Sequence, residues 1–396
     1  MHRHFYSTED LDFPEFISIC EQKVDHEDYP FSSGVNKKIV HYEGDVIRSL
    51  IGTPQAVELK TELHHCLKDG PGVIAIKKAF QNLKAVDRAT EIFRKIIDEE
   101  KDEAEHYGDH FAIPGENERL WNSLQKMCER DTEAFISYYD NPVLCLICEA
   151  WLGPYFQMTA QVNIVKPGAK AQQPHRDYHF GFQQNDVVSE FPITVQILSQ
   201  FLTLQGAVAH TEMKIESGPT MFLPFSQQYP LGYMAWRETK FIKYFEKNSV
   251  QISLNKGDAY FLSPALFHAA GPNTEMTDRI ANLLQISSVF GKAMESVDRV
   301  KMTKLIYPVL LKKKKMNQLC EDEVRTIGAS VTDSYSFPTN LDTDSPTEGS
   351  VPETAQSLME RALSKKWPVE KFCLKLDEAV KRRLPLKFQH NHMNRY

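Results

Sequence analysis

Hydrophobic and polar residues alternate along much of the middle of the chain, between Tyr155 and Phe290. Side chains that alternate with a period of two lie on opposite faces of a β-strand. Turn-forming residues separate the alternating runs and long helical spacings are absent, so we expect a mainly β core, built as a sandwich, barrel or jelly roll. The expected strands are 155–165, 193–204, 220–223, 250–254, 259–262 and 279–289.

Helical spacing is typical of the region before this core. Thr53 and Pro54 form a cap and first-turn pair for a helix that ends near Gly70, and Asp87 is expected to cap a second helix. We expect further helices and one strand on this side of the core, and we interpret the first part of the chain as a wrapping arm. The ranges are 117–139 and 142–151 for the helices, 73–76 for the strand and 1–52 for the arm.

The region after the core begins with a basic, apolar helical stretch that contains Lys312 to Lys315. A Ser/Thr/Pro/Asp-rich segment, 330–352, is expected to be a mobile linker, and helical spacing returns over 354–386. The sequence therefore predicts an arm with flanking helices (1–154), a catalytic core (155–290) and a C-terminal helical extension (291–396), as one catalytic domain.

Composition and charge restrict the partners and the compartment. The chain of 396 residues has a formal net charge of −7, which disfavours bulk attraction to nucleic acid or to an anionic membrane. No apolar stretch is long enough to span a bilayer, and the N-terminal segment lacks the apolar region of a secretory signal. Seven cysteines, an odd number, fit a reducing compartment, so we expect an intracellular, cytoplasmic protein.

The first expected strand has a polar row on one face. Gln157, Thr159, Gln161 and Asn163 share this face, and hydrophobic residues share the other. An exposed strand face would explain this pattern equally well. The alternative, which we test, is that the polar row points into the mouth of a barrel and lines a ligand pocket.

Two other motifs have simpler explanations. Cys145 and Cys148 have the spacing of half a zinc site, but they lie in an apolar helical segment without a second Cys/His pair, so packed thiols are expected. The four consecutive lysines from Lys312 are expected to form a solvated helix face.

The main candidate chemistry lies in His175-Arg176-Asp177 and in a later histidine, His268. On an extended chain His175 and Asp177 point to the same side, so both can bind one metal ion. Two histidines and one aspartate form the facial triad of non-haem Fe(II) oxygenases, which leaves three positions for a bidentate 2-oxo acid and O₂. Arg279, with Ala281, Leu283 and Gln285 on the same strand face, would offer a planar fork to the far carboxylate of 2-oxoglutarate.

These residues together resemble the phytanoyl-CoA dioxygenase family of Fe(II)/2-oxoglutarate-dependent oxygenases. The H-x-D motif, the distal His and the Arg eleven residues later are matched by His175, Asp177, His268 and Arg279. The family's Gly-x-Thr turn is similar to the segment 217–227. The resemblance covers about a third of the chain and implies a double-stranded β-helix (jelly roll) over 155–290, with the three ligands holding Fe(II) and Arg279 binding 2-oxoglutarate.

Two further contacts to 2-oxoglutarate are implied by the resemblance, from Gln172 and Thr220, although ordinary loop and turn residues would explain both equally well. Phe225 and Gln227 replace the Gly and His that the family usually has in its turn, and Ala270 stands where some members have a Ser that binds the co-substrate. These departures leave the three metal ligands intact.

The resulting hypothesis is an Fe(II)/2-oxoglutarate-dependent dioxygenase that uses O₂ to hydroxylate a small organic substrate, an acyl thioester or another metabolite, with release of succinate and CO₂. The sequence does not identify this substrate or the oligomeric state. Two alternatives stay open: a cupin-like metalloenzyme that does not use 2-oxoglutarate and would not need Arg279, and a non-catalytic binding protein on the same fold. An Arg279 side chain that points away from the metal would favour the first alternative.

Overall fold

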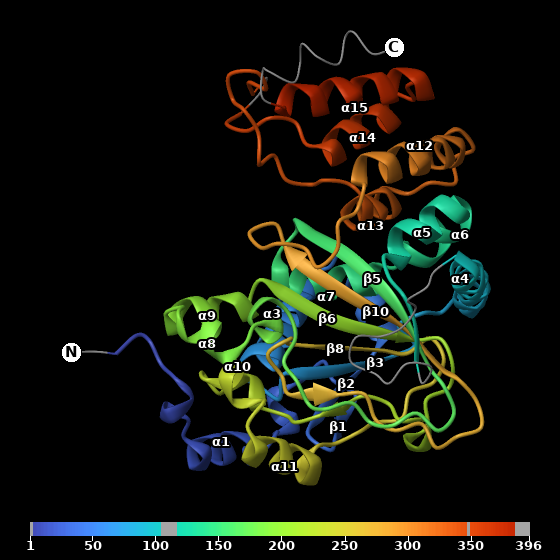
Figure 1. Ribbon diagram of the computed structural model, residues 1–396. Helices are drawn as coiled ribbons and strands as arrows, with labels where there is room; N and C mark the ends of the chain where they lie inside the picture. The colour runs from blue at the N-terminus through green and yellow to red at the C-terminus, as the bar shows by residue number, and fades with distance from the viewer. Residues whose placement is uncertain (1–2, 104–116, 347–348, 385–396) are drawn as a thin grey trace.

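The computed structural model describes residues 3–103, 117–346 and 349–384, and its main feature there is an eight-stranded mixed sheet (Figure 1). The strand order is β1-β2-β3-β8-β6-β10-β5-β4, and every neighbouring pair is antiparallel except the parallel pair β2 and β3. The strands are Gly34–Asn36 (β1), Ile39–Glu43 (β2), Val73–Lys77 (β3), Asn117–Leu120 (β4), Phe156–Val165 (β5), Thr203–Ala209 (β6), Ala259–Leu262 (β8) and Arg279–Ser288 (β10).

A second, smaller sheet is formed by β7 (Met221–Phe222) and β9 (His268–Ala269). Isolated bridges extend it on both sides, between His175 and His268 and between Phe222 and Val250. Residues of both sheets line one cavity, which therefore lies between them.

Helices surround the two sheets. Figure 1 shows α12, α14 and α15 together at one end of the molecule, with α1 and α11 at the opposite end. No described helix is both long enough and apolar enough to cross a membrane. The helices are Phe13–Cys20 (α1), Gly44–Leu50 (α2), Gln55–Lys68 (α3), Leu83–Glu103 (α4), Ser123–Arg130 (α5), Thr132–Tyr139 (α6), Pro142–Leu152 (α7), Asn185–Ser189 (α8), Ile193–Gln200 (α9), Gly232–Ala235 (α10), Thr239–Asn248 (α11), Arg299–Lys315 (α12), Glu321–Val331 (α13), Ala355–Ser364 (α14) and Val369–Arg383 (α15).

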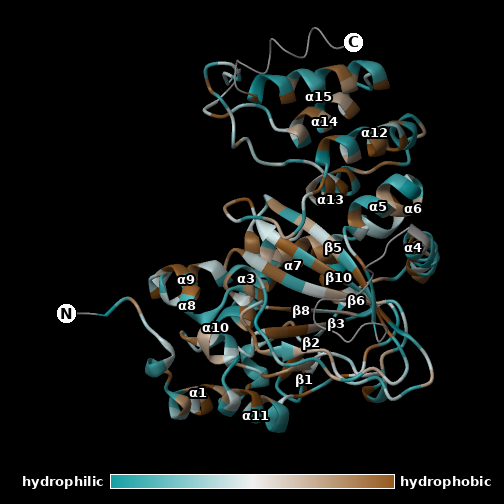
Figure 2. Ribbon diagram, viewed as in Figure 1, coloured by the Kyte–Doolittle hydropathy of each residue, from teal (hydrophilic) through white to brown (hydrophobic). Residues whose placement is uncertain are grey.

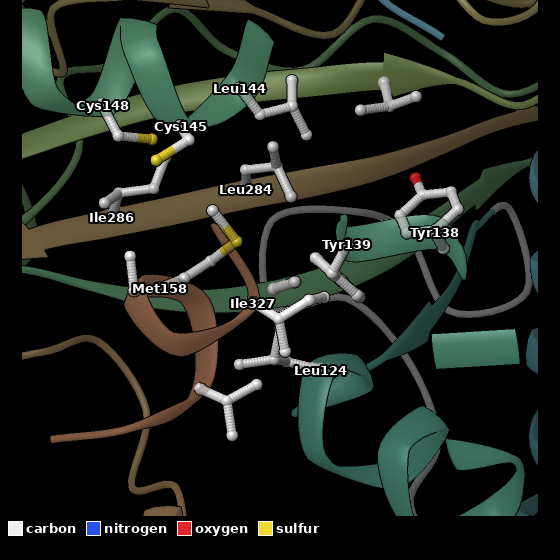
Figure 3. Packing of buried hydrophobic residues seen from close by; sticks show 14 of the residues in the cluster. Leu124, Tyr138, Tyr139, Leu144, Cys145, Cys148, Met158, Leu284, Ile286 and Ile327 are labelled. Carbon is white, nitrogen blue, oxygen red and sulfur yellow. The ribbon is translucent and has the colours of Figure 1, made fainter. Parts of the chain in front are cut away.

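The largest hydrophobic cluster packs helices against the strands β5 and β10 (Figure 3). Met158 of β5 and Ile286 of β10 are cross-strand partners, and both are buried in this cluster. Cys145 and Cys148 of α7 lie in the same cluster as free thiols, and burial raises the pKa of Cys145 to about 12. The two cysteines are packed thiols, as the sequence predicted.

Many of the expected elements are present. The structure confirms strands at β3, β5, β7, β8 and β10 and helices at α3, α7, α12, α14 and α15, with small differences at their ends. Figure 2 shows β5 and β10 changing between hydrophobic and hydrophilic colours along their length, which is the alternation on which these two strand predictions rested. The basic residues at the end of α12 are in part ion-paired, since Lys313 contacts Glu323.

Four expectations about the core and its surroundings were wrong. The range 193–204 is mostly the helix α9, because Pro192 precedes the first turn and a short run of mixed apolar and polar residues does not distinguish strand from helix. The range 250–254 contributes only isolated bridges, and 155–290 contains the ten-residue helix α11. The first part of the chain is more than a wrapping arm, because β1 and β2 form one edge of the large sheet.

Two expected helices before the core also differ from the structure. The range 117–139 begins as β4, which pairs with β5, and Asn122 in the left-handed region (φ 52°) separates it from α5. Asp131 then ends α5 and caps α6 through a bond from the Ala134 N–H. Asp87 lies inside α4, and the Asn82 side chain instead accepts the bond from the Ala85 N–H at the start of that helix.

The described residues of the expected mobile linker pack against the C-terminal helices. Asp344 is buried and forms ion pairs with Arg382 and Arg383 of α15, and the Ser336 hydroxyl donates to the carbonyl of Pro352. The end of the expected helical range, at 386, lies outside the described residues.

Candidate metal centre

His175, Asp177 and His268 meet at one buried point of the structure. Their ligand atoms all lie within 4.8 Å of one another, and all three side chains are buried. An oxygen of Asp177 lies 3.7 Å from Nε2 of His175, and its other oxygen lies 3.4 Å from Nε2 of His268. Among the described residues this is the one group of three or more such side chains with metal-binding spacing.

Backbone pairing brings the two histidines together. The segment 172–177 runs beside the segment 264–270, where the N–H groups of Gln172 and Asp177 donate to the carbonyls of Ala270 and Pro264. Between them, the backbones of His175 and His268 exchange two hydrogen bonds of 2.9 and 3.1 Å. An extended segment turns alternate side chains to one side, so His175 and Asp177 both face His268.

Each imidazole ring is oriented by its second nitrogen. Nδ1 of His175 lies 3.0 Å from the carbonyl oxygen of Gln173, and Nδ1 of His268 lies 2.9 Å from that of Leu266. Because a carbonyl oxygen only accepts, Nδ1 donates in both rings, and the Nε2 atoms are the ring nitrogens that face Asp177. The arrangement therefore offers two imidazole nitrogens and one carboxylate to a metal ion.

Asp177 is further held by Gln205 of β6, whose amide Nε2 donates to a carboxylate oxygen of Asp177. Burial acts to raise the pKa of Asp177, but the charges and hydrogen bonds of His175, His268 and Gln205 outweigh it and lower this pKa. The carboxylate is thus ionised at neutral pH. Gln205 was missed by the sequence analysis, because its contact with Asp177 depends on which strands pair in the large sheet.

Arg176, between the two ligands, points to the opposite side and anchors the loop. Its guanidinium is buried and donates to the carbonyl oxygens of Ser226 (2.6 Å) and Tyr229 (3.1 Å). It also lies 5.1 Å from the ring centroid of Tyr233. A Cβ at Gly232 would overlap the guanidinium, so the close packing here requires glycine.

Arg279, at the start of β10, lines the same cavity as the three candidate ligands. It donates to the Gly218 carbonyl, and its Nε is buried without a hydrogen-bond partner. No carboxylate lies within ion-pair distance of it among the described residues. Burial lowers the pKa of Arg279 to about 10, so the side chain is cationic at neutral pH.

The two tentative contacts, Gln172 and Thr220, also line this cavity. The Thr220 hydroxyl lies 2.7 Å from the hydroxyl of Tyr260, a residue of β8 that was not predicted as a site residue. The Gln172 side chain accepts a bond from the Ala270 N–H (3.2 Å).

The polar row of β5 is buried over most of its length, and part of it lines the cavity. Gln161 and Asn163 are lining residues, while Thr159 is buried and donates to the backbone carbonyl of Gln285. Gln157 is only partly buried and lies outside the lining. The prediction that this row faces a pocket is therefore confirmed for Gln161 and Asn163. On β10, Ala281, Leu283 and Gln285 line the cavity with Arg279, as their alternation predicted.

Comparisons with known proteins give one family and one curated relative. A family model described as phytanoyl-CoA dioxygenase (PhyH) matches residues 59–281. The multifunctional dioxygenase ausE of Emericella nidulans is 29% identical over 128 residues, which are 32% of this chain and 40% of that protein. The chain thus aligns with less than half of this curated relative.

Solved structures with a similar arrangement include two enzymes of nogalamycin biosynthesis. The non-haem alpha-ketoglutarate-dependent carbocyclase SnoK has a TM-score of 0.42 and 16% identity, over 60% of this chain and 84% of that chain. The epimerase SnoN, in complex with Fe³⁺, alpha-ketoglutarate and nogalamycin RO, has a TM-score of 0.41 and 14% identity, over 59% of this chain and 84% of that chain.

Proposed function

The chain belongs to the phytanoyl-CoA dioxygenase family, whose model covers more than half of it, and from this premise we propose that it is an Fe(II)/2-oxoglutarate-dependent dioxygenase. The observation that supports this proposal most strongly is that one cavity contains His175, Asp177, His268 and the buried cation Arg279. The three ligands would bind Fe(II), and Arg279 would bind 2-oxoglutarate.

The donor set fits Fe(II). Two imidazoles and one carboxylate are the donors of the facial triad, and each imidazole Nε2 is turned inward by its Nδ1 hydrogen bond. The Gln205 amide and the backbone pairing of His175 with His268 hold these donors in place. With Fe(II) and 2-oxoglutarate bound, the cofactors would supply activation of O₂, decarboxylation of 2-oxoglutarate to succinate and oxidation of a substrate C–H bond.

The surroundings of Arg279 fit a dicarboxylic co-substrate. A buried guanidinium favours an anionic partner, and a carboxylate accepts two parallel hydrogen bonds from it. Tyr260 and Thr220 add hydroxyl groups to the same wall, and Gln172 adds an amide. We assign these residues to the binding of 2-oxoglutarate.

We also propose that the two sheets form a double-stranded β-helix, as the family resemblance implies. The cavity between the sheets and the bridge of His175 to β9 support this arrangement. In this arrangement, residues 155–290 would form the catalytic core. Residues 1–154 would be the arm and flanking helices, and residues 291–396 the C-terminal extension.

The alternative cupin-like metalloenzyme would not need Arg279. Because Arg279 lines the cavity of the three ligands and does not point away from it, its placement favours the 2-oxoglutarate-dependent enzyme. The intact ligand set favours an enzyme over a non-catalytic binding protein. The free cysteines support our proposal of a reducing, cytoplasmic setting.

Turnover of a metabolite mixture tests this function. Purified protein, Fe(II), 2-oxoglutarate and ¹⁸O₂ should produce succinate and CO₂, and one metabolite should gain one labelled oxygen atom. Asp177→Ala should abolish both, whereas Arg94→Ala, a surface change at a residue paired with Asp278, should not. Absence of 2-oxoglutarate-dependent succinate from the wild type would contradict the proposal.

A further inference from the structure

Three glutamine side chains lie on the large-sheet wall of the cavity, and all three are buried. They are Gln161 of β5, Gln205 of β6 and Gln285 of β10. An amide offers a donor at one end and an acceptor at the other, so its direction decides what it can bind. Charged neighbours fix the direction of each amide here.

Arg119 of β4 fixes the direction of two of the three amides. Its guanidinium only donates, and it bonds Oε1 of Gln161 at 2.8 Å. The Nε2 group of Gln161 then donates to Oε1 of Gln285 at 2.9 Å. The remaining end of the Gln285 side chain is its Nε2 group, which is a donor on the cavity wall.

Asp177 fixes the third amide in the opposite sense. The carboxylate only accepts, so Gln205 must turn its Nε2 group toward Asp177. Rotating this amide by 180° would place Oε1 of Gln205 against a carboxylate oxygen of Asp177. Oε1 of Gln205, at the other end of this amide, is buried without a hydrogen-bond partner. A buried, unpaired acceptor is destabilising unless a ligand pairs with it.

The free donor and the free acceptor are neighbours. Gln285 and Gln205 are direct partners in the antiparallel pairing of β10 with β6, so their side chains leave adjacent points of the same sheet face. Apolar side chains make up much of the nearby lining, including Leu262, Leu283 and Met213. The cavity, of about 380 Å³, has room for a small organic molecule.

We propose that this cavity recognises an apolar substrate through one neutral hydroxyl group, which accepts a hydrogen bond from Nε2 of Gln285 and donates one to Oε1 of Gln205. A hydroxyl oxygen does both at a single atom, whereas an anionic group cannot satisfy the acceptor of Gln205. Because the same Gln205 amide contacts Asp177, the bound hydroxyl lies close to the candidate metal ligands. This inference rests on the proposed function in that it takes the cavity to be the substrate site.

Binding of three bicyclic probes tests this inference. Borneol is an alcohol that donates and accepts, camphor is a ketone that only accepts, and camphane is the parent hydrocarbon. Affinities are measured by calorimetry on the full chain with Fe(II) and 2-oxoglutarate in the absence of O₂, so that no turnover is needed. We expect the wild type to bind borneol at least ~10-fold more tightly than either of the other probes.

Two variants locate the effect. In Gln285→Met the preference for borneol over camphane should fall by ~5-fold or more, because the donor is lost. Leu283→Met, a change at another lining residue of the same strand, should keep the preference. If Gln285→Met does not fold, the affinities of the wild type for the three probes still test the inference.

Equal affinity of the wild type for borneol and camphane would overturn the inference, as would an unchanged preference in folded Gln285→Met. Either result would mean that the two glutamines bond each other or serve only the fold. The proposed function would be unaffected, because succinate formation tests it separately. If the wild type prefers borneol but forms no succinate, the proposed oxygenase function is contradicted. The cavity would then be an alcohol-binding site only.

Discussion

His175 and His268 exchange two backbone hydrogen bonds, and this pairing brings their ring centroids to 4.6 Å from each other. The two residues are far apart in sequence, so the candidate metal centre depends on the fold as much as on the ligands. A change that separates these two segments should abolish metal binding even with all three ligands present.

Replacement of a candidate ligand should weaken metal binding strongly. His175→Ala, Asp177→Ala and His268→Ala are each expected to lower the affinity for Fe(II) at least ~100-fold, because a two-ligand site has too few donors. Anaerobic equilibrium dialysis measures this affinity. His65→Ala, at a half-exposed histidine of α3, is the matched control and should bind as the wild type does. Near-normal Fe(II) affinity in His268→Ala would remove it from the ligand set.

Gln205 should act on the metal through Asp177. Gln205→Leu removes the hydrogen bond that orients the carboxylate, and we expect the Fe(II) affinity to fall by about 10–100-fold while all three ligands remain. Gln55→Leu, at an exposed position of α3, serves as the control. An unchanged affinity in Gln205→Leu would mean that the paired histidines alone orient Asp177.

Arg279 should determine the affinity for 2-oxoglutarate but not for the metal. Arg279→Ala is expected to weaken 2-oxoglutarate at least ~30-fold, since loss of one partner of a buried charged pair costs about 2–5 kcal/mol. Arg279→Lys should recover only part of the affinity, because an ammonium lacks the planar fork. Anaerobic titration with Fe(II) present gives both values. Equal affinity for 2-oxoglutarate in wild type and Arg279→Ala would favour the cupin-like alternative.

Gly232 should be intolerant of a side chain. In Gly232→Ala the new Cβ would overlap the Arg176 guanidinium, so we expect a loss of about 1–3 kcal/mol in the free energy of unfolding and weaker Fe(II) binding. In Gly328→Ala, within α13, the added Cβ meets only the flexible Gln356 side chain at 3.3 Å, and helix propensity favours alanine. Chemical denaturation compares the two variants. Equal stability of Gly232→Ala and wild type would show that Arg176 can move without consequence.

The sequence predicted the ligands better than their surroundings. His175 and Asp177 are two residues apart on an extended segment, so local geometry places them on one side. The link to His268 and Arg279 came from the chemistry of the facial triad and of carboxylate binding, to which the family resemblance added, and the structure places all four around one cavity. The alternation predicted the lining by Gln161 and Asn163 of β5 and by Ala281, Leu283 and Gln285 of β10, but Gln157 lies outside the lining and Leu284 belongs to it.

Long-range pairing explains what the sequence could not predict. Gln205 meets Asp177 because β6 pairs with β8, where Gln205 lies opposite Leu262, and the residues after β8 pair with the segment of Asp177. No local pattern contains this information. Asn117 to Leu120 form a strand because β5 offers an edge, although the following residues are helical. The opposite error occurred at α9, where a run of mixed apolar and polar residues after Pro192 became a helix whose Val195 and Leu198 are exposed.

The most direct test of the account is anomalous diffraction at the iron edge from crystals grown without O₂ in the presence of Fe(II) and 2-oxoglutarate. The account predicts one anomalous peak bonded to Nε2 of His175, Nε2 of His268 and a carboxylate oxygen of Asp177, with 2-oxoglutarate bound to the iron and its far carboxylate on Arg279. An iron peak elsewhere, or 2-oxoglutarate density away from Arg279, would contradict it.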